Sequence, residues 1–354
     1  MKKKRIKIIV LSTLILIFMV TYRTINKQSH NNGIRNDINT NKMNNNTSST
    51  KTKKINIGFY NVENLFDIYD DPQTSDEDFT PNGIMQWDKE RYNDKLEDLA
   101  EVIDDFNPVI LGLAEVENFD VINDLIKQKE LAEINYKIIH AENNDTRGID
   151  VAAIYNSDIF NLNDYRYHRV SGKGNSNTRD ILELNGNFMN QSPLTIFITH
   201  WPSRRKGTNE TEYKRISIAK QLRSIIDKIL QNNSNENIII MGDFNDEPSD
   251  ISIHKYLMKD DFYNLHKKYE DKNIGTVNHR GEWLVFDQII ISKSLLDNNT
   301  YQISTKSGEI FNDEDITFTH RDGNKSPSRT YGGIKYYGGI SDHYPVFAKL
   351  VVKY

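Results

Sequence analysis

The sequence predicts an α/β protein with packed β-sheets, and two features of the chain support this fold class. From Lys54 onward, short apolar runs alternate with amphipathic stretches, which indicates strands with helices between them. The 354 residues are 37% hydrophobic and 10% aromatic, enough to bury one large core. Because no internal repeat and no second linker interrupt this pattern, residues 55–354 are predicted to form a single domain.

A targeting segment is predicted at the N-terminus. Met1–Lys7 is strongly basic and Ile8–Val20 is an almost unbroken apolar run, which fits a secretory signal better than an ordinary spanning helix. No small-x-small cleavage site follows Tyr22, so residues 1–22 are either a signal peptide or an uncleaved membrane anchor. In both cases we expect the rest of the chain outside the cytoplasm, secreted or anchored to the outer face of the cell membrane.

Composition separates the next segment from the domain. Residues 23–54 are rich in Asn, Ser, Thr and Lys, so they are predicted to be a disordered tether. Residues 1–54 hold 12 of the 45 Lys and Arg residues but one of the 50 acids, which leaves 33 basic and 49 acidic residues, a formal net charge of −16, in residues 55–354. Such a domain lacks a generic electrostatic footprint for nucleic acid, so a polyanionic substrate would need local basic groups and a metal ion. The chain has no cysteine, which excludes disulfides, thiol nucleophiles and Cys-type zinc sites.

The domain is predicted to begin with a strand at Ile55–Tyr60, followed by a helix over Asp88–Phe106, in which Leu96, Leu99 and Ile103 recur at helical spacing. Two further helices are expected at Val121–Lys127 and Glu210–Leu230. The remaining strands are expected at Val109–Val116, Tyr136–His140, Val151–Tyr155, Ile181–Leu184, Leu194–Thr199, Ile238–Met241, Gln288–Ile291 and Val346–Val352.

Polar residues that could carry chemistry stand at the ends of these predicted strands, where loops gather functional groups. They are Asn61, Glu115, His200, Asp243, Asn245, Asp287, Asp342 and His343. Each one alone also fits an ordinary strand end or turn, because Gly, Asp and Asn are the usual turn residues. Their joint order along the chain is what indicates a site.

Side chains of these types suit the hydrolysis of a phosphoester. Mg²⁺ prefers oxygen ligands and keeps several waters, so one carboxylate and one amide can hold it. Such an ion polarises phosphoryl oxygens and stabilises a leaving alkoxide. A histidine oriented by an aspartate can deprotonate water or stabilise developing charge, and amide and imidazole donors can hold the non-bridging oxygens.

Two motifs, Gly242-Asp243-Phe244-Asn245 and the C-terminal Ser341-Asp342-His343-Tyr344-Pro345-Val346, make the sequence resemble the endonuclease/exonuclease/phosphatase family. Pancreatic-type deoxyribonucleases, base-excision-repair endonucleases, bacterial sphingomyelinases and inositol-polyphosphate 5-phosphatases share this fold. The stretches Tyr60–Asp67 and Thr199–Arg204 are similar to an exported bacterial branch, and the resemblance covers Lys54–Tyr354. It implies a four-layer α/β sandwich, in which two mainly antiparallel sheets pack face to face between helices, with the active site at one end.

The resemblance also implies how a metal ion and a phosphate would be held. Glu115 would be the principal ligand of Mg²⁺ or Mn²⁺, with Asn61 beside it and Asp342 completing the metal environment. Arg179 and Arg204 are the further residues expected to contact the phosphate of the substrate.

For the reaction itself, the resemblance implies that His343 is the catalytic imidazole and that Asp287 orients it. Asp243 would position the attacking water, Asn245 would contact the scissile phosphate, and His200 would donate to a phosphate oxygen. Repair-type members carry a tyrosine in the region of His200, so the chain is closer there to secreted deoxyribonucleases.

The leading functional prediction is a nuclease that cuts DNA or RNA outside the cell, as a monomer. The basic cluster Arg204-Arg205-Lys206, next to His200 in sequence, could follow a nucleic-acid backbone, although a solvated loop explains it equally well. Arg147 and Asp150 stand out by position only. The alternative is the same chemistry on a lipid or inositol phosphate headgroup, which the acidic domain and the membrane anchor both permit. A non-catalytic binding module is a third, weaker prediction, because the expected carboxylates, amides and histidines are all present.

Overall fold

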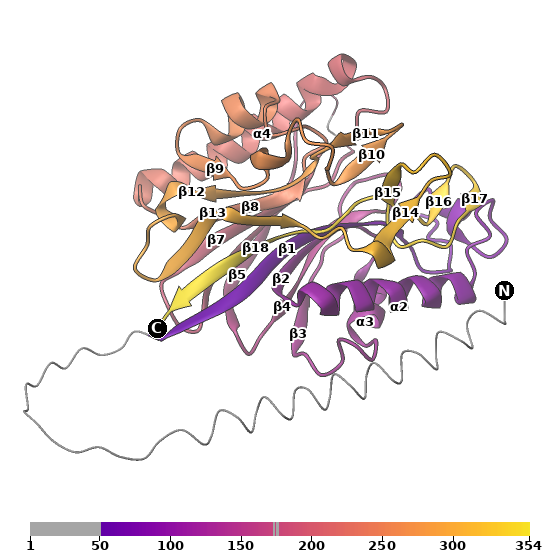
Figure 1. Ribbon diagram of the computed structural model, residues 1–354, viewed down its shortest axis with the longest axis horizontal. Helices are drawn as coiled ribbons and strands as arrows, with labels where there is room; N and C mark the ends of the chain where they lie inside the picture. Colours follow the sequence, from indigo (N-terminus) through magenta and orange to yellow (C-terminus); the bar gives the residue numbers. More distant parts are fainter. Residues whose placement is uncertain (1–50, 173, 175–176) are drawn as a thin grey trace, which may run out of the picture. The chain divides into compact units, whose positions relative to one another are not determined.

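The computed structural model describes residues 51–172, 174 and 177–354, in which two six-stranded sheets pack face to face between helices (Figure 1). The predicted fold class, an α/β sandwich, is thereby confirmed. The predicted targeting segment and nearly all of the predicted tether lie outside the described residues. Within the described ranges, no helix is both long and apolar enough to cross a bilayer.

The first sheet contains the start and the end of the domain. Its strand order is β13 (Tyr301–Ile310), β18 (Val346–Lys353), β1 (Thr52–Leu65), β2 (Pro108–Val116), β4 (Asp150–Asn156) and β3 (Tyr136–Ile139). The β1–β2 pair is parallel and the other neighbours are antiparallel. β1 begins three residues before the predicted strand because Thr52 pairs with Lys353, close to the C-terminus.

The second sheet comes from the middle of the chain. Its order is β5 (Phe160–His168), β6 (Ile181–Phe188), β7 (Leu194–His200), β8 (Ile238–Asp243), β12 (Asp287–Ser292) and β9 (Phe262–Asn264). The β7–β8 pair is parallel and the remaining pairs are antiparallel.

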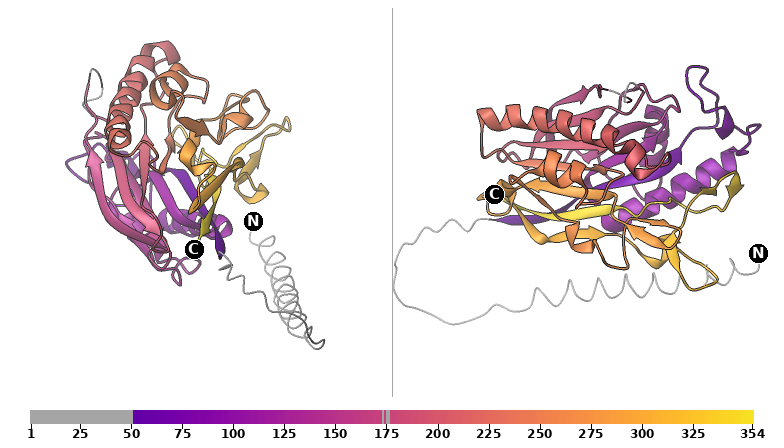
Figure 2. Two further views of the ribbon diagram at one scale, coloured as in Figure 1. Left: turned by 90° about the vertical axis from the view of Figure 1, so that its left-hand side faces the viewer. Right: turned by 90° about the horizontal axis from the view of Figure 1, so that it is seen from above.

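Helices cover the outer faces of both sheets (Figures 1 and 2). The helices α2 (Lys89–Phe106) and α3 (Phe119–Ile126) lie against the first sheet, and α4 (Thr208–Asn232), with the helical turn Ser252–Met258, lies against the second. The side chain of Asp88 caps α2 by accepting a hydrogen bond from the Arg91 backbone N–H at 3.0 Å. These three helices agree in position with the predicted ones.

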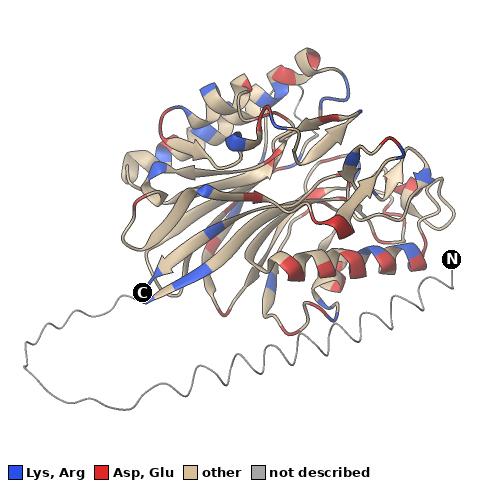
Figure 3. Ribbon diagram, in the orientation of Figure 1, with Lys and Arg blue, Asp and Glu red and all other residues tan. Residues whose placement is uncertain are grey.

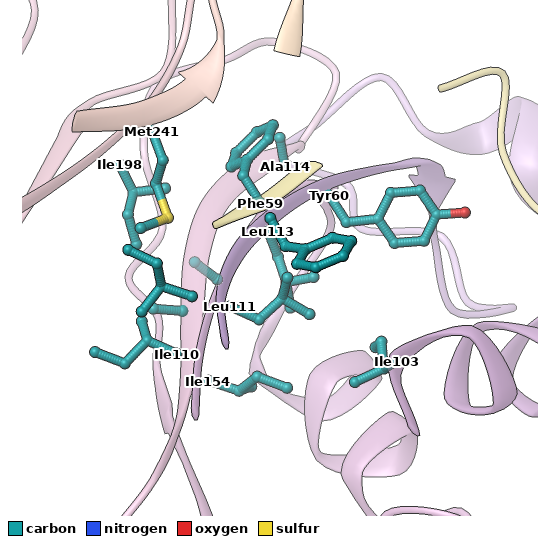
Figure 4. Packing of buried hydrophobic residues seen from close by; sticks show 14 of the residues in the cluster. Phe59, Tyr60, Ile103, Ile110, Leu111, Leu113, Ala114, Ile154, Ile198 and Met241 are labelled. Atoms are coloured by element: carbon teal, nitrogen blue, oxygen red, sulfur yellow. The ribbon is translucent and has the colours of Figure 1, made fainter. Parts of the chain in front are cut away.

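Strand periodicity divides the buried side chains between two layers. In β8, Ile239 and Met241 belong to the core between the sheets, whereas Ile240 packs with residues of α4. Gly112 lets the sheets approach each other, because a Cβ atom there would lie 2.8 Å from Ile198 Cγ2. Figure 4 shows Ile198 and Met241 on one side of the first sheet and Ile103 of α2 on the other.

The long loop between β13 and β18 forms small hairpins that the sequence did not predict. They are β14 (Thr317–Thr319) with β15 (Lys325–Pro327), and β16 (Tyr331–Gly332) with β17 (Lys335–Tyr336). A similar hairpin, β10 (Val277–His279) with β11 (Glu282–Leu284), precedes β12. These hairpins lie at the same end of the sandwich as the ends of β1 and β2 (Figure 1).

Candidate active site

Three of the predicted residues lie side by side across one sheet. β7, β8 and β12 are neighbours, and their register sets His200 beside Asp243 and Asp243 beside Asp287. In the other sheet, Asn61 in β1 pairs with the residue that precedes Glu115 at the end of β2. Strand register thus brings residues that are far apart in the sequence to one end of the sandwich.

The Asp243 carboxylate is the meeting point of the two sheets. Its Oδ2 accepts a hydrogen bond from Asn61 Nδ2 at 3.2 Å and lies 3.4 Å from His200 Nε2. Its Oδ1 accepts the backbone N–H of Asn245 at 2.9 Å. Asp243 is 1% exposed, and burial, with the charge of Asp287 adding to it, raises the pKa of this carboxyl.

Glu115 ends β2 in a strained backbone conformation, with φ at 63° in the left-handed region. Its Oε2 accepts the backbone N–H of Asn64, whose own φ is 51°, at 3.1 Å. Its Oε1 lies 3.9 Å from His200 Nε2. The unusual backbone therefore turns this carboxylate toward the residues around Asp243.

The His343 imidazole is held between carboxylates. Nδ1 lies 2.8 Å from Asp287 Oδ2, while Nε2 lies 4.0 Å from Asp243 Oδ2 and 3.9 Å from Asp342 Oδ1. Burial alone would lower the pKa of His343, but the charges of Asp287, Asp243 and Asp342 outweigh it and raise this pKa well above its ordinary value. The carboxylates around His343 therefore favour its protonated form.

His200 has the opposite electrostatic environment. Burial lowers the pKa of His200 well below its ordinary value, and the positive charges of Arg179, Arg147 and His343 lower it further. These surroundings favour the neutral ring, and Nε2 is the nitrogen that lies near Asp243, whereas Nδ1 has no hydrogen-bond partner among the described residues. The surroundings of the two histidines thus favour opposite charge states, the neutral ring at His200 and the protonated ring at His343.

Asp342 and Asn245 lie beside this group and have further partners. Asp342 Oδ2 accepts a hydrogen bond from Arg329 at 3.1 Å, and its side chain is 30% exposed. Asn245 donates from Nδ2 to the carbonyl oxygen of Trp201 at 3.0 Å. Ser341 fixes the loop before β18 to β1 by donating to the Asn61 carbonyl oxygen at 2.7 Å.

The predicted phosphate-binding arginines already have protein partners. Arg179 is buried and donates to Asp145 Oδ2 at 2.7 Å and to the Trp201 carbonyl oxygen at 2.9 Å. Arg204 donates to Asp246 Oδ1 at 2.7 Å and also pairs with Asp250. Arg179 is close enough to lower the pKa of His200, whereas Arg204 is held against the turn after β8.

Four residues that the sequence could not assign are also placed by the structure. Arg147 pairs with Asp145, at 3.3 Å between Nε and Oδ1. Asp150 Oδ2 lies 2.8 Å from His140 Nε2, and Asp150 pairs in register with Val116, the residue after Glu115. Arg205 and Lys206 are exposed.

Glu63 and Lys95 form a buried pair that sequence reasoning missed, and they hold the loop before β18 in place. Glu63 accepts the backbone N–H groups of Thr330 and Tyr331 at 2.7 and 3.2 Å. Lys95 of α2 donates to the Glu63 carbonyl oxygen and, at 2.8 Å, to Thr330 Oγ1. An acid inside a strand and a lysine on the buried face of a helix were the available signals, because neither residue type is usually buried alone.

The donor set of the site fits a hard divalent cation. Glu115, Asp342 and the amide oxygen of Asn61 are oxygen ligands of the kind that Mg²⁺, Mn²⁺ and Ca²⁺ prefer. One oxygen of Asp287, Oδ1, is buried and has no hydrogen-bond partner among the described residues. Asp243, Asp287 and His343 also form a group whose possible ligand atoms lie within 4.8 Å of one another. This much carboxylate charge in one buried place is consistent with a bound cation.

Known structures share the fold of the described chain. An endonuclease/exonuclease/phosphatase family protein from Bacteroides thetaiotaomicron is 16% identical, with a TM-score of 0.57, over 85% of this chain and 99% of that one. D. rerio TDP2 in complex with a single strand DNA product gives 14% identity and a TM-score of 0.52 over 84% and 98%. A mannosyl-6-phosphatase from B. thetaiotaomicron VPI-5482 gives 17% and 0.55 over 84% and 99%.

Sequence comparison gives a family but no individual relative. None of the curated proteins matches this chain. The model of the endonuclease/exonuclease/phosphatase family matches residues 56–352, nearly the whole of the described part. Members of this family generally depend on a divalent metal ion, and they hydrolyse phosphoester bonds. With the site geometry above, this match confirms the sequence-based prediction that the chain belongs to the endonuclease/exonuclease/phosphatase family and is a hydrolase acting on phosphoester bonds.

Proposed function

We propose that this protein is a nuclease that hydrolyses phosphodiester bonds of DNA or RNA outside the cytoplasm, with Mg²⁺ or Mn²⁺ as its metal ion. The observation that carries the proposal is the meeting of Asn61, His200 and His343 around the single carboxylate of Asp243. Such a group offers one base and several donors within reach of one phosphate.

Each residue has a role that follows from its geometry. Glu115 and Asn61, with Asp342 at the rim, would hold the metal ion, which polarises the phosphoryl oxygens and stabilises the leaving alkoxide. The raised pKa of Asp243 suits a base that orients and deprotonates water near neutral pH. The charged His343 and the neutral His200 both present Nε2 toward Asp243, where they can donate to the phosphate oxygens in the transition state.

Nucleic acid is favoured as the substrate by two observations. Arg205 and Lys206 are exposed in the loop that follows β7, just beyond His200. The fold is also that of a protein solved with a single strand DNA product. By contrast, α2 presents a row of acidic residues, which would repel a polyanion (Figure 3). Binding of nucleic acid would therefore depend on few phosphate contacts, and its affinity would decrease only weakly with rising salt concentration.

A small or lipid phosphoester is the second candidate, and one cavity favours it. A cavity of about 280 Å³ lies between the hairpins β10–β11 and β14–β15, next to Tyr344, which follows His343. Its wall includes four amide side chains, those of Asn273, Asn278, Asn312 and Asn324. Amides of this kind could hydrogen-bond a hydroxyl-bearing leaving group, such as a sugar or an inositol.

Substrate comparison tests the proposal. Purified protein is incubated with single-stranded DNA, plasmid DNA, RNA, a hexose 6-phosphate, an inositol phosphate and sphingomyelin vesicles, in Mg²⁺ and in chelator. The His343→Ala variant is run in parallel as the control for contaminating activity. We expect metal-dependent cleavage of nucleic acid that the variant lacks. Turnover of a small or lipid phosphoester with no cleavage of DNA or RNA would replace the nuclease by the second candidate.

A further inference from the structure

The cavity between the hairpins β10–β11 and β14–β15 is connected to the His343–Asp287 pair (Figure 1). Trp283 stands four residues before Asp287, and Tyr344 directly follows His343. The two aromatic rings stack on each other, with centroids 5.7 Å apart and ring planes 18° apart, and both residues belong to the cavity wall. The hydroxyl of Tyr344 lies 2.7 Å from Thr317 Oγ1, which ties the ring to β14. The wall is therefore joined through the chain to both members of the pair.

The amide groups in the wall have unused hydrogen-bonding capacity. The side-chain amides of Asn273 and Asn312 have no hydrogen-bond partner within the described part of the chain. Asn278 accepts a backbone N–H through Oδ1 at 2.9 Å, which leaves its amide nitrogen free to donate. Asn324 donates from Nδ2 to a neighbouring carboxylate at 2.9 Å, which leaves its amide oxygen free to accept. The wall thus offers both donors and acceptors to a ligand.

Positive charge distinguishes one side of the cavity from the rest of the domain. The hairpins β14–β15 and β16–β17, with the turn between them, span Thr317–Tyr336 and hold four Lys or Arg residues against one acid, in a domain whose formal net charge is −16. Among the described residues, the cavity wall contains Lys325 and no Asp or Glu. Lys325 is exposed, and its ammonium group has no carboxylate partner in the described ranges. It is therefore available to an anionic ligand.

We propose that this cavity receives one unpaired nucleotide of the strand whose phosphodiester is cleaved. The proposal rests on the proposed nuclease function and adds the form of the substrate, a single strand. A nucleotide combines a flat aromatic face, an edge of donors and acceptors and a negative phosphate, which match Trp283, the four amides and Lys325. Because Tyr344 follows His343 in the chain, a strand held at His343 can place a neighbouring nucleotide in the cavity.

The preference for a single strand follows from the size and chemistry of the cavity. Its volume of about 280 Å³ suits one nucleotide and is small for a base pair with its two sugars and phosphates. In a duplex, the edge of each base is already paired and its faces are stacked, so a base would have to leave the helix at a cost. A hexose or an inositol could use the same amides, but it lacks the aromatic face.

Tryptophan fluorescence tests the binding without measuring hydrolysis. Of the three tryptophans, Trp87 and Trp201 are buried and Trp283 is partly exposed, so a base that stacks in the cavity should quench Trp283. A short single strand and its duplex are titrated into the unsubstituted protein in chelator and into His343→Ala in Mg²⁺. We expect the single strand to quench at concentrations roughly 10-fold lower than the duplex does. Trp283→Phe should lose this quenching.

Cleavage assays in Mg²⁺ test the same residues by a second route. Asn312→Ala and Lys325→Ala, which change exposed side chains, should each raise KM for the single strand by roughly 5-fold and narrow its advantage over the duplex. Lys137→Ala is the matched control, because Lys137 is an exposed lysine on β3 and lies outside the cavity wall. It should leave both KM values unchanged. If Trp283→Phe does not fold, these variants decide the question.

The failure of the inference is distinguishable from the failure of the proposed function. Equal cleavage and equal quenching by single strand and duplex, or no quenching under either condition while DNA is cleaved, would overturn the inference and leave the nuclease function intact. Cleavage of neither DNA nor RNA would overturn the proposed function and the inference with it. Quenching of Trp283 by a hexose 6-phosphate or an inositol phosphate, but not by a single strand, would assign the cavity to the second candidate.

Discussion

His343 Nδ1 lies 2.8 Å from Asp287 Oδ2, and this contact joins the two sheets of the sandwich. Asp287 begins β12 of the second sheet, whereas His343 stands just before β18 of the first. Because Nδ1 is occupied, Nε2 is the nitrogen that faces Asp243 and the place of the substrate. The ring orientation is therefore set by a residue that need not touch the substrate itself.

The first prediction concerns this pair. His343→Ala should lower kcat by roughly 10²-fold or more, because a positioned acid–base group is lost, while substrate binding changes little. Asp287→Asn should act in the same direction but less, since the ring remains. The double variant should lose far less activity than the product of the two single losses, because the residues act as one unit. Single-turnover rates and circular dichroism measure these effects. Near-normal turnover of His343→Ala would exclude the proposed role of His343, and an unfolded His343→Ala protein would make His343 a structural residue.

The second prediction concerns the metal ion. Hydrolysis should disappear in a chelator and return with Mg²⁺ or Mn²⁺, because Glu115, Asn61 and Asp342 offer only hard oxygen ligands. The far-UV spectrum should show that the protein stays folded in the chelator. Activity that survives exhaustive chelation, checked by elemental analysis, would exclude the proposed mechanism.

The fold was predictable where a strand is buried on both faces. Ile238–Met241 is apolar throughout because one face packs between the sheets and the other against α4, so the signal is continuous. By contrast, β5 at the sheet edge reads Phe-Asn-Leu-Asn-Asp-Tyr-Arg-Tyr-His, with most of its side chains partly or fully exposed. Its pairing with β6 depends on backbone hydrogen bonds, which an apolar sequence pattern does not predict. The polar edge strand was therefore missed.

The candidate site was predictable for a related reason. Asp243 and Asp287 were found because they flank buried strands, and register then sets them opposite each other. Glu63 and Lys95 were missed because their partners, Thr330 and Tyr331, come from a loop more than 230 residues away. Glu63 and Lys95 acquire these partners only through the tertiary packing of β1, α2 and that loop.

The third prediction concerns this buried support. Burial raises the pKa of Glu63 and lowers that of Lys95, so both groups depend on their hydrogen bonds. Lys95→Met should lower the free energy of unfolding by about 3 kcal/mol, because the Glu63 carbonyl oxygen and Thr330 Oγ1 lose their donor. Lys89→Met, on the exposed start of the same helix, should change it by at most about 0.5 kcal/mol. Urea denaturation measures both, and equal losses would mean that Lys95 has no special role.

The fourth prediction concerns a buried histidine that is hydrogen-bonded to both β12 and β13. His266 is fully buried; its Nδ1 accepts the backbone N–H of Ile289 at 3.1 Å, and its Nε2 donates to the Glu309 carbonyl oxygen at 3.2 Å. Burial lowers the pKa of His266 to about 4, against an ordinary value near 6.5.

Because the folded pKa is depressed, the unfolded chain binds a proton on this histidine before the folded protein does. Stability should therefore be unaffected by His266 above about pH 6.5 and should fall as the pH drops from about 6.5 to about 4, by up to roughly 3 kcal/mol in all. His266→Asn, which keeps an acceptor for the Ile289 N–H, should be less stable than the unsubstituted protein at neutral pH, and this deficit should shrink as the pH falls through that window. Urea denaturation of both proteins at several pH values measures the deficit. If the lower stability of His266→Asn stays constant between about pH 6.5 and 4, the pKa of His266 is not depressed by folding. The ring would then have the same charge in the folded protein as in the unfolded chain.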